Sequence, residues 1–194
     1  MENKSSELTV GFALTGSFCT FQQVIPQVQT LVKEGYRVLP IMSETSCSTD
    51  TRFGNAAEFV LQLETITGNR VIHNIKEAEP IGPKKLLDAL VIAPCTGNTI
   101  AKLANGIADT TVTLAAKSHL RNKRPIVVAV SSNDALSGNA KNLGILLARK
   151  HFYFVPFGQD DCFEKENSLV AKMDMVLPAL QAALNQKQLQ PMII

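Results

Sequence analysis

The sequence predicts a single doubly wound α/β domain, in which helices flank a parallel sheet. Continuous apolar runs, typical of strands that are buried on both faces, alternate with segments in which apolar residues recur at helical spacing. Residues 88–109 show this most clearly, because the apolar run at 89–93 is followed by a small polar turn. After that turn Ile100, Leu103 and Ile107 follow at helical spacing. Strands that alternate with helices form right-handed βαβ units, so a Rossmann-like, flavodoxin-like sheet is expected.

Length and composition are those of one soluble domain. The chain has 194 residues and a formal net charge of +2, which argues against a strongly basic surface for nucleic acid or membrane. It has no Trp and two Tyr, so an aromatic platform for stacking bases is not expected. We expect a flexible N-terminus at 1–7, the domain at 8–187, and an apolar tail at 188–194 that could dock on a neighbour.

Cellular location is predicted from what the sequence lacks. No apolar segment approaches the roughly 20 residues of a membrane span, and the first ten residues have no apolar signal-peptide core. The four cysteines show no CxxC spacing and are expected to be reduced thiols. A cytoplasmic location follows.

Five strands are expected, besides a short strand at 70–73 as an alternative to a loop, and two of them contain or precede a proline. The expected strands cover residues 8–14, 36–42, 89–93, 126–130 and 152–155, the last of them being short. Pro40 suggests that its strand is at a sheet edge or carries a bulge, and Pro94 is expected to end its strand, because proline has no N–H for a ladder.

Helices and loops fill the rest of the chain. Helices are expected over 18–34, 55–67, 110–120, 140–150 and from 168 towards 186, besides the one that follows the turn at 95–99. In the helix over 140–150, Leu143, Leu146 and Leu147 are expected to point inward. Ser168 is expected to cap the last helix. Polar loops are expected at 43–50, 131–138 and 156–167, and the acidic residues of the last loop are expected to be solvated.

Four turns rich in small hydroxyl residues or glycine follow predicted strands. Because the carboxyl ends of parallel strands meet at one edge of the sheet, these turns are expected to converge into a cradle for phosphate and polar groups. The candidate cofactor-binding residues are Thr15, Gly16, Ser17, Ser43, Thr45, Cys95, Thr96, Gly97, Asn98 and Thr99, and the candidate substrate-binding residues are Ser131, Ser132 and Asn133. The alternative is that these residues only cap helices.

The first turn favours a mononucleotide ligand. It is not a GxGxxG fingerprint, because Gly11 lies within the predicted strand and only Gly16 falls at the turn. It is not a Walker loop either, because no lysine follows. A dinucleotide site and an NTPase site are therefore disfavoured.

Titratable residues give few candidates for catalysis. Cys95 lies at a predicted helix N-terminus, which would lower the pKa of its thiol, but a buried small thiol is the simpler interpretation. His73 and His119 are isolated in sequence, and His151 sits between a helix and a strand, where capping is expected. No set of ligands has zinc spacing, so no metal is expected.

The stretch 94–109 resembles the FMN-binding flavoprotein family, which includes cysteine decarboxylases and flavin prenyltransferases. The decarboxylases carry P-A-S-A-N-T followed by I-A-K-I-A-N-G-I-A-D, and this chain reads PCTGNT followed by IAKLANGIAD. The resemblance extends over about residues 8–185. It implies FMN bound by the turns, and a homo-oligomer (a trimer or dodecamer) with residues 105–113 near the contact.

Departures from the family pattern concern catalysis. Fourteen residues before Pro94, where the decarboxylases have a catalytic histidine, this chain has Pro80, which can neither take nor give a proton. The decarboxylases' P-x-M-N motif is replaced by Val130-Ser131-Ser132-Asn133, of which only Asn133 is shared. Decarboxylase chemistry is therefore not expected, and the catalytic residues stay unassigned.

Within the family, three segments are similar to an oxidoreductase subunit of sporulating bacteria: GFALTGSFCTF, MSETSCSTDTRFG and APCTGNTIAKLANGIADT. This resemblance implies oxidation of a dihydro-dicarboxylate in the mother-cell cytoplasm. It also implies a second subunit that binds NADP in a nicotinamide-binding fold. Two alternatives stay open: a scaffold subunit with a vestigial flavin site, and an enzyme like the flavin prenyltransferases.

Overall fold

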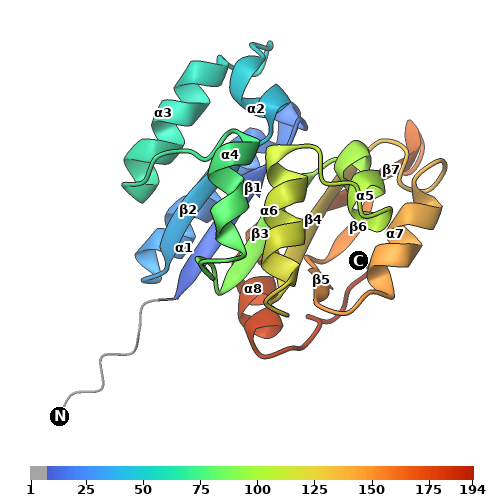
Figure 1. Ribbon diagram of the computed structural model, residues 1–194. Helices are drawn as coiled ribbons and strands as arrows, with labels where there is room; N and C mark the ends of the chain where they lie inside the picture. Colours follow the sequence, from blue (N-terminus) through green and yellow to red (C-terminus); the bar gives the residue numbers. More distant parts are fainter. Residues whose placement is uncertain (1–7) are drawn as a thin grey trace.

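The computed structural model describes residues 8–194, and the expected flexible segment 1–7 lies outside the described residues. A seven-stranded sheet in the order β2-β1-β3-β4-β7-β6, with β5 also paired to β4, forms its centre (Figure 1). The strands are β1 (Thr9–Leu14), β2 (Arg37–Met42), β3 (Ala89–Cys95), β4 (Ile126–Ser132), β5 (Phe152–Phe154), β6 (Phe157–Asp161) and β7 (Lys165–Ala171).

Strands β2, β1, β3, β4 and β5 pair in parallel, in that order across the sheet. The predicted doubly wound domain is therefore confirmed. Pro40 lies in the edge strand β2, as its missing N–H suggested. The structure adds what the sequence did not predict, an antiparallel extension in which β7 pairs with the end of β4.

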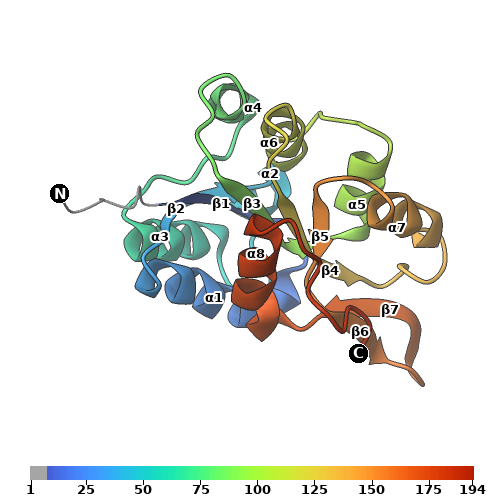
Figure 2. The same ribbon diagram turned by 90° about the horizontal axis from the view of Figure 1, so that it is seen from below.

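Helices cover both faces of the sheet (Figure 2). One layer consists of α1 (Phe21–Lys33), α3 (Ala56–Thr67) and α8 (Val176–Leu184), and the other of α4 (Ile75–Ala78), α5 (Gly97–Ala104), α6 (Thr111–Leu120) and α7 (Ala140–Leu147). Three short 3₁₀ helices complete the fold: η1 (Phe18–Thr20), η2 (Glu79–Ile81) and η3 (Met173–Met175). Helix α7 ends three residues earlier than expected, and Leu147 is exposed instead of pointing inward.

The core sits around the two central strands. Every residue of β3 and β4 is buried, because helices pack on both faces of these strands. Burying a Val, Leu or Ile side chain contributes roughly 1.5–3 kcal/mol. The continuous apolar runs that the sequence shows at these positions are thus explained, and they fix the centre of the sheet from which the functional turns emerge.

The prediction that Pro94 ends its strand was wrong. Strand β3 continues to Cys95, and its register with β4 shifts between Ile92 and Cys95. Proline is tolerated at such an irregularity because no ladder hydrogen bond is required of it there.

Residues 43–50 are not only a loop, because they contain the short helix α2 (Glu44–Ser48). The Ser43 hydroxyl accepts a hydrogen bond from Ser46 N (3.2 Å), and the buried Ser46 hydroxyl donates to Leu14 O (3.1 Å). The Glu44 carboxylate accepts bonds from Thr111 N and Thr111 Oγ1 at 2.9 and 2.7 Å. These tertiary bonds order a segment that composition alone marks as a loop.

The C-terminal third differs most from the prediction. Residues 156–167 were expected as a loop, but they contain β6 and the start of β7, which form an antiparallel hairpin. Ser168 is therefore in a strand and caps no helix, and α8 begins only at Val176. Ser131 and Ser132, expected in a loop, extend β4, where they face Val170 and Leu169 of β7. The β4–β7 pairing lies between residues almost 40 positions apart, so local sequence patterns do not reveal it.

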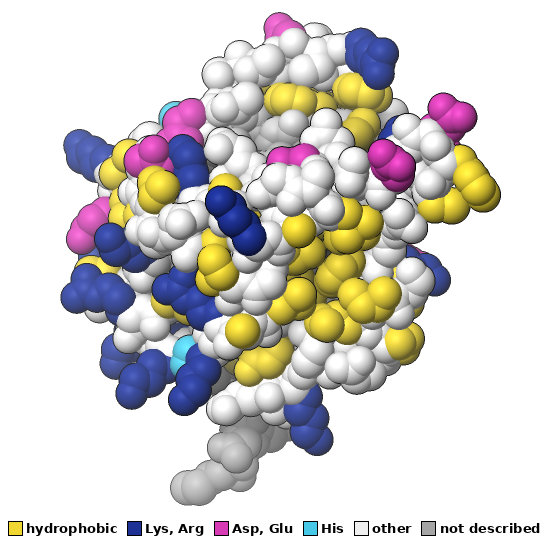
Figure 3. All heavy atoms as spheres, turned by 90° about the vertical axis from the view of Figure 1, so that its right-hand side faces the viewer, with side chains coloured by type: hydrophobic (Ala, Val, Ile, Leu, Met, Phe, Trp, Pro, Cys, Tyr) yellow, Lys and Arg dark blue, Asp and Glu magenta, His cyan; other side chains and the backbone are white. Residues whose placement is uncertain are grey.

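The apolar C-terminal tail docks on its own chain. Phe157 N donates to Met192 O (3.0 Å), and Ile194 N donates to Phe157 O (3.1 Å). Ile193 and Ile194 stay 60% and 57% exposed, and α7 adds the exposed Ile145. The face that carries α7 and the hairpin shows a broad hydrophobic patch flanked by Lys and Arg side chains (Figure 3). None of the described helices has both the length and the apolar character needed to cross a membrane.

The buried His119 makes folding stability dependent on pH. Its Nε2 lies 3.1 Å from Pro125 O, and burial lowers its pKa to about 4 from the ordinary 6.5. Between these two values the unfolded chain binds a proton that the folded chain does not, so stability falls as the pH falls. We expect a loss of about 2 kcal/mol between pH 7 and pH 5 from this group, measured by urea unfolding.

His119→Gln should remove most of this loss, because glutamine does not titrate. His73→Gln, a substitution of an exposed histidine, is the control and should leave the pH dependence as it is in the parent protein. An unchanged slope in His119→Gln would show that other groups cause the acid sensitivity.

Candidate functional site

An open cleft of about 780 Å³ lies at the carboxyl edge of the sheet. The turns after β1, β3 and β4 form its floor, and the β6–β7 hairpin forms one wall. The chain leaves β1 in one direction and β3 in the other, so the cleft lies at the topological switch point of the sheet, where open α/β folds bind ligands.

Many predicted site residues line this cleft. They are Gly16, Ser17, Thr96, Gly97, Asn98, Ser131, Ser132 and Asn133. The Ser17 and Ser131 hydroxyls lie 2.7 Å apart and join the first turn to the end of β4. The structure thus brings three of the four predicted turns together.

Other predicted residues lie behind the lining. Thr15 is 1% exposed; its hydroxyl donates to Pro94 O (2.7 Å) and accepts from Thr96 N (3.1 Å). The Thr99 N–H donates to the Thr96 hydroxyl (3.4 Å), which caps α5. Ser43 caps α2, and the exposed Thr45 lies in that helix, outside the lining. Thr15, Thr99 and Ser43 thus act within the turns and helix caps and are not part of the cleft lining.

Cys95 is a buried structural thiol. It is the last residue of β3, it is 0% exposed, and it does not line the cleft. Burial raises the pKa of its thiol, which is opposite to the lowering that a helix N-terminus would cause. The interpretation as a buried small thiol therefore holds.

A chain of hydrogen bonds leads from the cleft floor into the helical layer. Ser132 Oγ donates to Asp134 Oδ1 (2.5 Å), and Asn139 Nδ2 donates to Asp134 Oδ2 (2.7 Å). Asn142 Nδ2 then donates to Asn139 Oδ1 (2.8 Å), and Asn105 Nδ2 donates to Asn142 Oδ1 (3.3 Å). The Asp134 carboxylate is thus held by neutral donors at the edge of the cleft.

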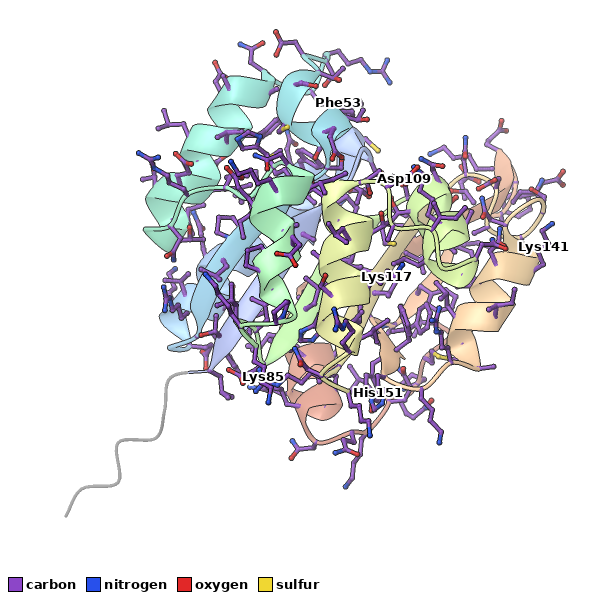
Figure 4. All side chains as sticks on the ribbon, in the orientation of Figure 1. Phe53, Lys85, Asp109, Lys117, Lys141 and His151 are labelled. Atoms are coloured by element: carbon purple, nitrogen blue, oxygen red, sulfur yellow. The ribbon has the colours of Figure 1, made fainter. Side chains whose placement is uncertain are left out.

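The cleft also has apolar lining that the sequence did not reveal. Phe18 follows the first turn, Phe53 comes from the loop after α2, and Val170 comes from the hairpin. Phe53 projects at the carboxyl end of the strands, with the guanidinium carbon of Arg52 4.9 Å from its ring centroid (Figure 4). Apolar side chains opposite hydroxyl-rich turns suit a ligand with a planar ring and a polar chain.

The hairpin contributes charged residues that sequence reasoning treated as a solvated loop. Lys165 Nζ lies 2.6 Å from Asp160 Oδ2, and both residues line the cleft. This ion pair raises the pKa of the Lys165 ammonium. The residues were missed because only the unpredicted β4–β7 pairing brings them to the site.

Histidine is absent from the lining, and His151 lies with Lys85 at the opposite end of the molecule (Figure 4). Pro80 lies in η2, which packs against α4 and α6 and does not reach the cleft. Among residues 8–194 there is no group of three His, Cys, Asp or Glu side chains that could hold a metal ion.

Comparison with known proteins agrees with the fold. The flavoprotein family matches residues 1–177, and the chain belongs to this family. It is 50% identical to the B subunit of dipicolinate synthase of Bacillus subtilis (strain 168), over 95% of this chain and 92% of that protein.

Solved structures give the same relationship. The crystal structure of the dipicolinate synthase B subunit from Bacillus halodurans C is 45% identical, with a TM-score of 0.89 over 96% of both chains. Burkholderia xenovorans DmrB in complex with FMN has a TM-score of 0.69 over 94% of this chain and 98% of its own, at 20% identity, which shows the shared fold.

Close packing at the cleft floor can be tested at Gly97. A Cβ atom there would clash with Ser132 Oγ and lie 2.6 Å from Asp134 Oδ1 and 2.7 Å from Asn139 Nδ2. We expect Gly97→Ala to destabilise the fold by roughly 1–3 kcal/mol in urea unfolding, because overpacking forces the network apart.

Gly144→Ala is the matched control. Gly144 lies in α7, and a Cβ added there would meet no atom of another part of the chain within 4 Å, so alanine should stabilise by about 0.5–1 kcal/mol. Equal stability of both variants would contradict the described packing at Gly97.

Proposed function

We propose that the cleft binds FMN. The fit rests on this chain's own residues: the first-turn backbone of α5 and the Ser17 hydroxyl offer donors for a phosphate or ribityl chain, and Phe18 and Phe53 offer apolar faces. Bound FMN would supply the capacity to accept or donate a pair of electrons. Membership of the flavoprotein family supports this proposal.

We further propose that the chain acts as the B subunit of a dipicolinate synthase. The observation that best supports this proposal is the 50% identity to the Bacillus subtilis protein over nearly the whole of both chains. The reaction would remove two electrons and two protons from dihydrodipicolinate and give the aromatic diacid. It would take place in the cytoplasm of the mother cell of a sporulating bacterium.

The partner in this proposal is the A subunit of dipicolinate synthase, which would bind NADP. Either the flavin held by this chain or the nicotinamide of the partner would accept the electrons. This chain's part is to hold the diacid beside Ser131, Ser132 and Asn133, with the hairpin limiting access of water.

A scaffold role without redox chemistry is the second candidate. It is favoured by one observation: the titratable side chains in the lining are those of Cys19, Asp134, Asp160 and Lys165, with no histidine. Reconstitution with and without FMN, and with and without the partner, separates the two roles by following dipicolinate formation. Full activity without any flavin would contradict the first proposal and support the scaffold role. Activity of this chain without the partner, given FMN and a prenyl phosphate, would instead indicate an enzyme like the flavin prenyltransferases.

A side chain at Gly16 should block FMN. Gly16 lines the cleft, its φ is not positive, and an added Cβ would approach only Phe18 Cε2 and Thr45 Cγ2, both at 3.8 Å. We expect the purified protein to keep flavin absorbance through dialysis, and Gly16→Val to lose it while its unfolding midpoint stays close to that of the parent. Retention of flavin by Gly16→Val would place the ligand elsewhere.

A homo-oligomer is also proposed, with the contact near residues 105–113. The support is a groove of about 310 Å³ lined in part by Leu103, Ile107 and Leu120, in which Ile107 is 47% exposed. Exposed apolar side chains at a groove favour burial against another copy.

Ile107→Asp should therefore lower the mass measured by light scattering to that of a smaller species, because it places a charge in the contact. Leu61→Asp, on the exposed side of α3, is the control and should leave the mass unchanged. An oligomer that survives Ile107→Asp would argue for a contact through another surface.

A further inference from the structure

The β6–β7 hairpin places one cation against the cleft. Of the charged side chains that line it, Asp134 and Asp160 are acidic and Lys165 is basic. Asp134 accepts hydrogen bonds from Ser132 and Asn139, and as a carboxylate it repels anions. Lys165 is therefore the group in the lining that can attract an anion.

The Lys165 ammonium is held in place but is not saturated. Asp160 Oδ2 accepts one hydrogen bond from Nζ at 2.6 Å, and an ammonium has three donors. The Lys165 side chain is 58% exposed, so its other donors are accessible to a ligand.

Ser168 adds an unpartnered polar group on the same strand. It lines the cleft, and its hydroxyl makes no hydrogen bond to another described residue, but the hydroxyl oxygen is not among the fully buried atoms that lack a partner. The O–H is therefore open to the cleft and can donate a hydrogen bond to a ligand atom there. A carboxylate, which has two oxygens and only accepts, suits an ammonium and a hydroxyl together.

We propose that Lys165 and Ser168 form the subsite for a carboxylate of the substrate, so that the hairpin makes the cleft selective for a dicarboxylate over a monocarboxylate. This inference rests on the proposed function of the cleft. Lys165 would pair with the carboxylate directly and Ser168 would donate its O–H to it. Asp160 would compete with the ligand for the same ammonium.

The test compares pyridine-2,6-dicarboxylate with pyridine-2-carboxylate by calorimetry on the FMN-loaded chain, together with its partner subunit. Lys165→Gln should weaken binding of the diacid about tenfold or more, in line with the loss of a charge-assisted hydrogen bond. Binding of the monoacid should change little, FMN affinity should not change, and Lys165→Arg should restore most of the diacid affinity.

Asp160→Asn separates recognition from structure. It breaks the same ion pair as Lys165→Gln, so a purely structural role predicts a loss in both variants. Charge recognition predicts changes of diacid affinity in opposite directions: Lys165→Gln should bind the diacid more weakly than the parent protein, and Asp160→Asn should bind it more tightly. Lys172→Gln, just after β7 and outside the cleft lining, is the matched control and should have no effect.

The outcomes distinguish this inference from the proposed function. If the parent protein binds FMN and the diacid, and Lys165→Gln binds the diacid equally well, the subsite is wrong and the proposed function stands. If the parent protein binds FMN but no diacid, the proposed substrate and the subsite both fail. If Lys165→Gln and Asp160→Asn both weaken diacid binding, the ion pair is structural and the subsite is overturned.

Discussion

The hydroxyl of Thr15 joins the two turns between which the cleft opens. The pairing of strands β1 and β3 ends at Ala13 and Ile92, and Pro94, two residues further on, has no N–H to donate to a ladder. Thr15 supplies the connection instead, by donating to Pro94 O and accepting from Thr96 N. One buried side chain therefore holds the residues that precede α5, whose first turn is capped by the Thr96 hydroxyl.

Much of the fold could be predicted because its signals are local. Full burial of β3 and β4 produces continuous apolar runs, and caps such as Thr110, which forms a capping box with Thr113, mark the helix starts. The hairpin and α2 could not be predicted, because tertiary partners order them. β7 depends on β4, and α2 depends on bonds to Leu14 and Thr111. The prediction that Pro94 ends β3 was wrong for a related reason. The register of β3 with β4 shifts between Ile92 and Cys95, and at such an irregularity no ladder hydrogen bond is required of the proline.

The candidate site could also be predicted only in part. Hydroxyl and glycine residues at strand ends converge as topology requires, but sequence cannot tell which face of a turn each side chain takes. Thus Ser17 and Asn98 line the cleft, whereas Thr15 and Cys95 are buried behind it. The aromatic and charged lining comes from segments without a strand-end signature, such as the loop that carries Phe53. Family resemblance identified the turn at Pro94 but carried no information on the hairpin, which brings Asp160 and Lys165 to the cleft.

The pairing of the C-terminal tail with β6 has a consequence for how the molecule behaves in a crowded solution. An unpaired strand at the border of a sheet is a template for other chains, and natural proteins shield such borders. Here Ile193 bridges to Phe157 of the border strand β6, and Ile72 bridges to Ile41 of the border strand β2. These two bridges, from segments more than a hundred positions apart in the sequence, each shield part of a border and discourage the sheet from growing there by addition of further strands.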